Sequence, residues 1–181
     1  MKSCYQFRDQ NVLEHGESVH KRFNELRSHL MDGTELSGWR IPDWCHDPLI
    51  KERVSLIDSE TIRLYQVYHD CGKPLCREVD SDGKQHFPDH AAVSKRCWLE
   101  HGGSPEVGEL IGMDMDAHTL KSDVVEEFSQ RPQAILLLLT ALSELHSNAA
   151  MFGGIESTSF KIKYKNLERM GKRVIALVAQ R

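Results

Sequence analysis

The chain has 181 residues, of which 40% are hydrophobic and 28% charged, and its formal net charge is −4. This balance gives no sign of a nucleic-acid coat protein or of a protein that binds membrane surfaces. No stretch approaches the roughly 18 consecutive apolar residues of a membrane-spanning helix. The first ten residues, MKSCYQFRDQ, are too polar for a secretory signal peptide. We therefore expect a cytoplasmic protein with no membrane partner.

Cysteine and histidine are the two informative residue types. The five cysteines are odd in number and contain no CxxC pair, which is typical of free thiols in a reducing compartment. The ten histidines are more than an average chain of this length carries, and several stand near acidic residues. The spacing of the histidines relative to acidic residues is therefore informative about metal binding.

The N-terminal third begins with a predicted helix. Apolar residues recur at steps of three, four and seven over residues 11–30, which predicts one amphipathic helix. Residues 31–49 contain Gly, Pro and Trp without periodicity and are interpreted as a long ordered loop. Ser59 can cap a second helix over residues 60–70, which ends before Gly72 and Pro74.

The remaining elements follow the same logic. An Asp-Gly turn signal predicts a loop or short hairpin over residues 76–90, and Pro88 suits the first turn of the helix that follows. Ser104 and Pro105 start another helix, and Pro132 ends a short one. Expected helices therefore lie at 89–103, 104–115, 122–130, 132–152 and 157–181. With about seven helices and no convincing sheet, we predict an all-α, single-domain helical bundle spanning residues 1–181.

Several histidines and carboxylates could project from successive helices toward a shared interior point. Imidazole nitrogen and carboxylate oxygen are the ligands of divalent metals such as Mn, Fe, Zn, Co or Mg. The candidate metal ligands are His15, His69, Asp70, His90, Asp114, His118 and Glu144. Asp116 and His146 are weaker candidates beside them.

His69 and Asp70 are adjacent, at the end of the helix predicted over 60–70. Neighbours on a helix diverge by about 100°, so both can bind one ion only if it lies over the groove between them. Alternatively, Asp70 bridges to a second ion or orients a water. The negative partial charge at the C-terminal end of a helix also favours a cation there.

The segments EHGESVHKRF, YHDCGKP and DGKQHFPDHAAVSKR, in this order, resemble the HD superfamily of metal-dependent phosphohydrolases. They are most similar to the HD domain of bacterial CCA-adding enzymes, and the resemblance covers roughly residues 11–120. It implies an HD-type helical domain that binds one or two divalent ions. The resemblance does not distinguish among Mn, Fe, Co, Ni, Zn and Mg.

The resemblance also implies roles for single residues. His15 matches the first metal-binding histidine, and His69 and Asp70 match the signature pair. Lys73 matches a lysine that some members direct at a substrate phosphate, and His90 matches a histidine that adds a second metal or a substrate contact. We therefore assign Asp70 and Lys73 as catalytic residues.

Two positions depart from the family pattern. Many relatives have a histidine where this chain has Asp114, and His118 could substitute for it. The family's last metal-binding aspartate is replaced by Glu144, with His146 nearby. A longer carboxylate can still bind a cation, so either one or two ions is possible.

Each candidate also has an ordinary structural interpretation. His15 could face solvent, and His90 could cap its helix, as could Asp89. The cluster from Asp114 to His118 could be a polar loop, and Glu144 could face solvent at a helix end. A buried lone carboxylate would be costly unless it is paired or metal-bound.

Three lysines alternate with apolar residues near the start of the last predicted helix. Lys161, Lys163 and Lys165 would lie on one side of an extended segment, but not of a helix. On the functional interpretation, Lys161 and Lys163 bind substrate phosphate together with Lys73. On the structural one, they are a solvated face.

The leading hypothesis is a divalent-metal-dependent phosphohydrolase acting on a phosphate mono- or diester of a nucleotide or a nucleic-acid end. Examples are a 2′,3′-cyclic phosphate, a 2′-nucleotide or a 3′-phosphate. The alternative is a nucleotide-binding or regulatory module with reduced catalysis, and a third option is an HD-type oxygenase with a di-iron site. The oligomeric state is left open.

Overall fold

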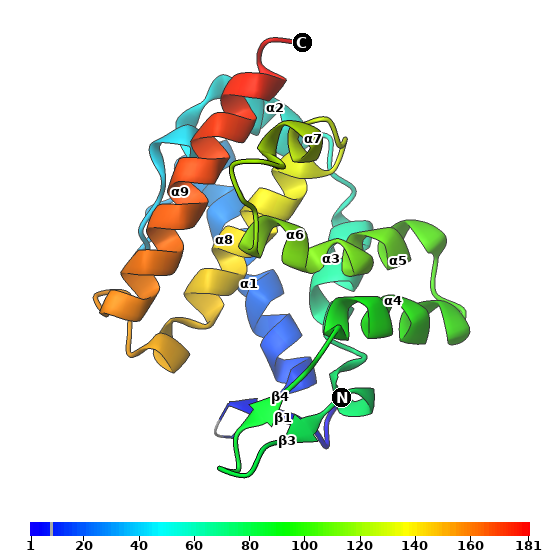
Figure 1. The fold of residues 1–181 in the computed structure, drawn as a ribbon. Coiled ribbons are helices and arrows are strands. Elements are labelled where there is room, and N and C mark those ends of the chain that lie inside the picture. Colours follow the sequence, from blue (N-terminus) through cyan, green and yellow to red (C-terminus); the bar gives the residue numbers. More distant parts are fainter. Residues whose placement is uncertain (8) are drawn as a thin grey trace. The chain divides into compact units, whose positions relative to one another are not determined.

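A computed structural model describes residues 1–7 and 9–181 (Figure 1). The chain is all-α, as predicted, apart from two small antiparallel strand pairs in the described part. It divides into two compact units, which we describe separately. Unit 1 comprises residues 1–20 and 58–115, and unit 2 comprises residues 21–57 and 116–181. The expectation of a single domain stays a prediction.

Unit 1 begins with β1 (Tyr5–Phe7) and β2 (Gln10–Asn11), an antiparallel pair that the sequence did not suggest. Helix α1 (Val12–Asp32) starts immediately afterwards and continues into unit 2. The unit's other elements are α3 (Ser59–Tyr68), the 3-10 turn η2 (Lys73–Leu75), β3 (Glu78–Val79), β4 (Gln85–His86), α4 (His90–Glu100) and α5 (Pro105–Gly112). The strands β3 and β4 form the hairpin that the Asp-Gly signal predicted.

Helix starts in unit 1 differ in detail from the predictions. Asp58, not Ser59, is the N-cap of α3, and its carboxylate accepts a hydrogen bond from the Thr61 amide at 2.7 Å. Pro88 lies before α4 rather than in its first turn. Asp89 occupies the N-cap position with a φ of 50°, but its side chain makes no capping hydrogen bond. Ser104 caps α5 as predicted.

Unit 2 contains η1 (Asp43–His46) and α2 (Pro48–Ser55). The prediction of a loop over residues 31–49 is therefore wrong where these two helices begin. Asp47 caps α2 and Pro48 occupies its first position, a start signal that a short helix can satisfy without a long apolar period. The other elements are α6 (Asp114–His118, shared with unit 1), α7 (Val125–Ser129), α8 (Ala134–Ser147), η3 (Ala149–Phe152) and α9 (Thr158–Val178).

Helix α8 is the most buried helix of unit 2, as its apolar composition predicted. Every residue from Leu137 to His146 is buried. Helix α9 packs against α8, α7 and η1 and contributes buried Phe160, Met170 and Val174 to the core. None of the described helices is long and apolar enough to span a membrane. All five cysteines are free thiols, as predicted.

Candidate metal centre

His15, His69 and Asp70 converge in unit 1 from two elements that are distant in sequence. His15 lies in the first turns of α1, and His69 and Asp70 follow the last turn of α3. The two segments approach closely because position 16 is a glycine: a Cβ atom there would lie 2.2 Å from the Val67 carbonyl oxygen. This close approach places the His15 ring edge-on to the His69 ring, with 5.2 Å between centroids.

The candidate ligand atoms of these three residues lie close enough together to hold one divalent ion. Asp70 Oδ2 lies 3.8 Å from His15 Nε2 and 3.2 Å from His69 Nε2. One ligand atom from each residue lies within 4.8 Å of the others. Ligands bound at about 2.1 Å can be at most about 4.2 Å apart across one ion, so both measured distances fit. Two imidazoles and a carboxylate are also a usual donor set.

All three side chains are removed from solvent: the exposed fractions are 0% for His15, 1% for His69 and 1% for Asp70. The interpretation of His15 as a solvent-facing residue is therefore wrong. Burial of a carboxylate is costly unless cations or hydrogen bonds compensate it. Burial by itself would raise the pKa of Asp70, but its interactions with His69 and with the ammonium group of Lys73 outweigh burial and hold this pKa well below its ordinary value.

Backbone carbonyls orient the histidines. His69 Nδ1 donates to the Gln66 carbonyl at 2.8 Å, and His90 Nδ1 to the Phe87 carbonyl at 3.1 Å. In each neutral ring, Nε2 is then the nitrogen with the lone pair, as in typical metal-binding histidines. His90 Nε2 lies 3.7 Å from Asp70 Oδ1, on the other oxygen of the carboxylate. His90 therefore belongs to the same cluster as the signature pair.

Lys73 approaches Asp70 from the turn that follows it. Its Nζ atom lies 2.6 Å from Asp70 Oδ2 and 2.9 Å from Oε1 of Gln6 in β1, and 5.3 Å from the centre of the Phe87 ring. The Gly-Lys-Pro turn is fixed by Gly72, whose amide donates to Ser94 Oγ at 2.9 Å. A Cβ atom at Gly72 would lie 2.4 Å from the Ser94 backbone nitrogen, so this turn needs glycine.

Asp114 is buried in unit 1, where Tyr65 donates a hydrogen bond to its Oδ1 at 2.7 Å. One of its carboxylate oxygens also lies within 4.8 Å of a ring nitrogen of His69. Asp114 therefore lies beside His69 in this unit, and its assignment as a metal ligand stays a prediction. Asp116, by contrast, forms an ion pair with Arg131 in unit 2.

His118 and Glu144 contact each other in unit 2. His118 Nε2 lies 2.8 Å from Glu144 Oε2, and Glu144 is buried. The expectation that Glu144 could face solvent at a helix end is therefore wrong. An imidazole beside a carboxylate can form an ion pair or contribute two metal ligands, so their assignment as ligands stays a prediction.

His146, a weaker candidate ligand, has a structural role instead. Its Nδ1 donates to the Leu142 carbonyl at 2.8 Å, and its Nε2 accepts from the Arg40 amide at 3.0 Å. Its ring also stacks on Trp39, with 4.1 Å between centroids. Burial lowers the pKa of His146 to about 4. With both nitrogens engaged by backbone groups, neither has a lone pair left for a metal ion.

The lysines of the last helix do not lie on one side, as they would in an extended segment. Residues 161–165 lie within α9, so the extended geometry that would align Lys161, Lys163 and Lys165 is absent. Lys161 Nζ lies 3.0 Å from Glu156 Oε2, and Lys163 Nζ lies over the Phe152 ring. Substrate binding by Lys161 and Lys163 stays a prediction.

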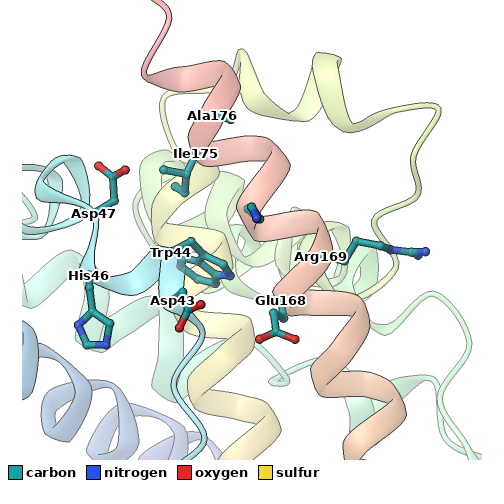
Figure 2. A pocket seen from close by; sticks show the side chains of 9 residues that line it. Asp43, Trp44, His46, Asp47, Glu168, Arg169, Ile175 and Ala176 are labelled. Carbon is teal, nitrogen blue, oxygen red and sulfur yellow. The ribbon is translucent and has the colours of Figure 1, made fainter.

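Unit 2 also contains an open cavity of about 700 Å³ between η1 and α9. Figure 2 shows the Trp44 indole on its wall, with Asp43 and Glu168 nearby and Arg169, the next residue of α9, beyond Glu168. None of the residues predicted from sequence to bind metal or substrate lines this cavity. Its mixture of acidic, basic and apolar groups does not define one ligand class.

Gln6 and Tyr65 contact the cluster but were not predicted. Tyr65 occurs in an apolar helical run, where its hydroxyl carries no sequence signal. Gln6 lies in a short polar segment before the first helix, and nothing in its spacing relates it to Lys73. The Gln6–Lys73 and Tyr65–Asp114 hydrogen bonds each join residues far apart in the sequence, so only the folded chain brings them together.

Comparisons of the chain with protein-family models, with curated proteins and with solved structures gave no significant match.

Proposed function

We propose that this protein is a divalent-metal-dependent phosphohydrolase of the HD superfamily, acting on a phosphate mono- or diester of a nucleotide or a nucleic-acid end. The observation that carries the proposal is the convergence of His15, His69 and Asp70, with Lys73 directly beside them. The order of the motifs from His15 to His90 supports the family, and the similarity to CCA-adding enzymes supports a substrate at a nucleic-acid end.

The residues have separate roles in this proposal. His15, His69 and Asp70 bind the ion. His90, beside Asp70, and Asp114, beside His69, bind a second ion or contact the substrate. A bound divalent ion lowers the pKa of a coordinated water and stabilises negative charge on phosphoryl oxygens. Lys73 holds a non-bridging phosphate oxygen through its ammonium group. The carbonyls of Gln66 and Phe87 keep His69 and His90 oriented.

The test combines ion binding with hydrolysis. The purified protein is titrated with Mn²⁺, Co²⁺, Ni²⁺ and Mg²⁺ and assayed on bis-p-nitrophenyl phosphate, 2′,3′-cyclic AMP, 2′-AMP and a 3′-phosphorylated oligonucleotide. We expect ion-dependent hydrolysis of at least one substrate and its loss in His69→Ala and Asp70→Asn. His101→Ala is the control, because His101 is exposed and hydrogen-bonds to the backbone of its own helix.

Two outcomes contradict the proposal in different ways. Full activity in His69→Ala would exclude this cluster as the centre. Stoichiometric ion binding without turnover on the whole panel would favour the nucleotide-binding or regulatory module.

A further inference from the structure

The ammonium group of Lys73 lies on the same carboxylate oxygen that faces the two histidines. Lys73 Nζ is 2.6 Å from Asp70 Oδ2, and His69 Nε2 and His15 Nε2 are 3.2 and 3.8 Å from that oxygen. An ion bound by these three residues would use Oδ2 at about 2.1 Å. It would therefore lie less than about 5 Å from the ammonium.

Two cations at this separation repel strongly in this environment. Asp70 is 1% exposed and Lys73 is 8% exposed, so water screens their interactions little. Asp70 has one negative charge, which cannot compensate both a divalent ion and an ammonium group at full strength. The lysine and the ion therefore compete for the same oxygen.

The structure also supplies other partners for the ammonium. Gln6 Oε1 accepts a hydrogen bond from Nζ at 2.9 Å, and Nζ lies 5.3 Å from the centre of the Phe87 ring. An amide oxygen and an aromatic ring both stabilise a buried cation. If Lys73 leaves Asp70, these two contacts can retain it beside the site.

We propose that Lys73 is a two-position residue: it neutralises Asp70 when no ion is bound, and ion binding breaks its contact with Asp70 while Gln6 and Phe87 retain its ammonium group. This inference rests on the proposed metal centre and adds a regulation of it. Binding of the metal ion would then also release the Lys73 ammonium group from Asp70, so that it can bind the substrate phosphate. Gln6 is a positioning residue, because it acts through Lys73.

The test is the affinity for Mn²⁺, measured by isothermal titration calorimetry at constant pH and without substrate. Lys73→Met removes the competing charge but retains a long side chain, so we expect the Mn²⁺ dissociation constant to fall by roughly tenfold. Gln6→Leu removes an acceptor that the ammonium uses in both positions. Because Asp70 also compensates the ammonium when no ion is bound, the loss costs more in the ion-bound state, so we expect weaker Mn²⁺ binding. Lys84→Met is the matched control, because Lys84 is exposed on the neighbouring hairpin turn, and its affinity should be unchanged.

The outcomes separate this inference from the proposed function. Equal or weaker Mn²⁺ binding by Lys73→Met overturns the two-position lysine, while the metal centre and the hydrolase proposal remain. Unchanged Mn²⁺ binding by His69→Ala overturns the metal centre itself.

A second measurement needs no variant, in case Lys73→Met does not fold. Reductive methylation of the wild-type protein, followed by peptide mass spectrometry, compares the labelling of Lys73 with and without Mn²⁺. Displacement from Asp70 predicts faster labelling of Lys73 with Mn²⁺, relative to exposed Lys84. Unchanged or slower labelling under conditions where Mn²⁺ is bound contradicts the inference.

Discussion

Gly16 of α1 lies so close to Val67 of α3 that a Cβ atom at position 16 would be 2.2 Å from the Val67 carbonyl oxygen. This contact places His15, the preceding residue, beside His69 and Asp70. A small backbone displacement here therefore acts directly on the geometry of the cluster.

Gly16→Ala should destabilise the protein and weaken ion binding together. The new methyl group meets backbone atoms that cannot rotate away, so we expect the free energy of unfolding to fall by roughly 1–3 kcal/mol. Displacement of His15 should also raise the Mn²⁺ dissociation constant. Urea denaturation and calorimetry measure the two effects.

The matched control is Gly112→Ala, also in a helix of unit 1. A Cβ atom at Gly112 would meet the flexible side chain of Lys95, which can move. A Gly16→Ala protein as stable as Gly112→Ala, with unchanged ion affinity, would contradict the role assigned to this contact.

His90→Ala should have a smaller effect on ion binding than His69→Ala. His90 Nε2 is 3.7 Å from Oδ1 of Asp70, away from the oxygen that faces His15 and His69, and its side chain is 19% exposed. We expect Mn²⁺ affinity to fall by roughly tenfold, with binding retained. Calorimetry measures the Mn²⁺ affinity of both variants. His86→Ala is the control, because His86 is an exposed histidine of β4.

If His90→Ala abolished ion binding as completely as His69→Ala, His90 would be a principal ligand. If it left both affinity and stoichiometry unchanged, His90 would have no part in the cluster.

His146 predicts a pH dependence of stability in unit 2. Burial lowers its pKa to about 4, below the ordinary value of about 6.5, so the unfolded chain binds a proton more readily than the folded chain. Neutral His146 contributes fully to the free energy of unfolding above about pH 6.5. As the pH falls toward 4, this contribution decreases by roughly 3 kcal/mol. Urea unfolding from pH 7 to pH 4 measures it.

His146→Gln provides the comparison, because glutamine does not titrate in this range. The difference in unfolding free energy between wild type and variant should narrow as the pH falls. Parallel curves would show that His146 does not titrate with the expected shift. Asp70, whose pKa is lowered, contributes stability that is present above about pH 3.8 and is lost as the pH falls below that value.

Periodicity predicted the long helices well because it reports local interactions. Helices α1, α8 and α9 agree with the predicted ranges to within a few residues at each end, except that the predicted range 132–152 also includes the 3-10 turn η3. Helix α2 was missed because eight residues are too few for a clear period and its start follows a Gly- and Pro-rich segment. The β1–β2 pair was missed because two or three residues per strand carry almost no pattern.

For the candidate site, the sequence alone determined which chemical groups are available: the imidazoles of His15, His69 and His90, the carboxylate of Asp70 and the ammonium of Lys73. Only the tertiary structure decided that these groups meet, that His146 is engaged by backbone groups, and that Gln6 contacts Lys73. The physical reason is that residue type defines the available ligand atoms, whereas distances of 3–4 Å between remote residues depend on backbone packing, such as the approach of α1 to α3 at Gly16.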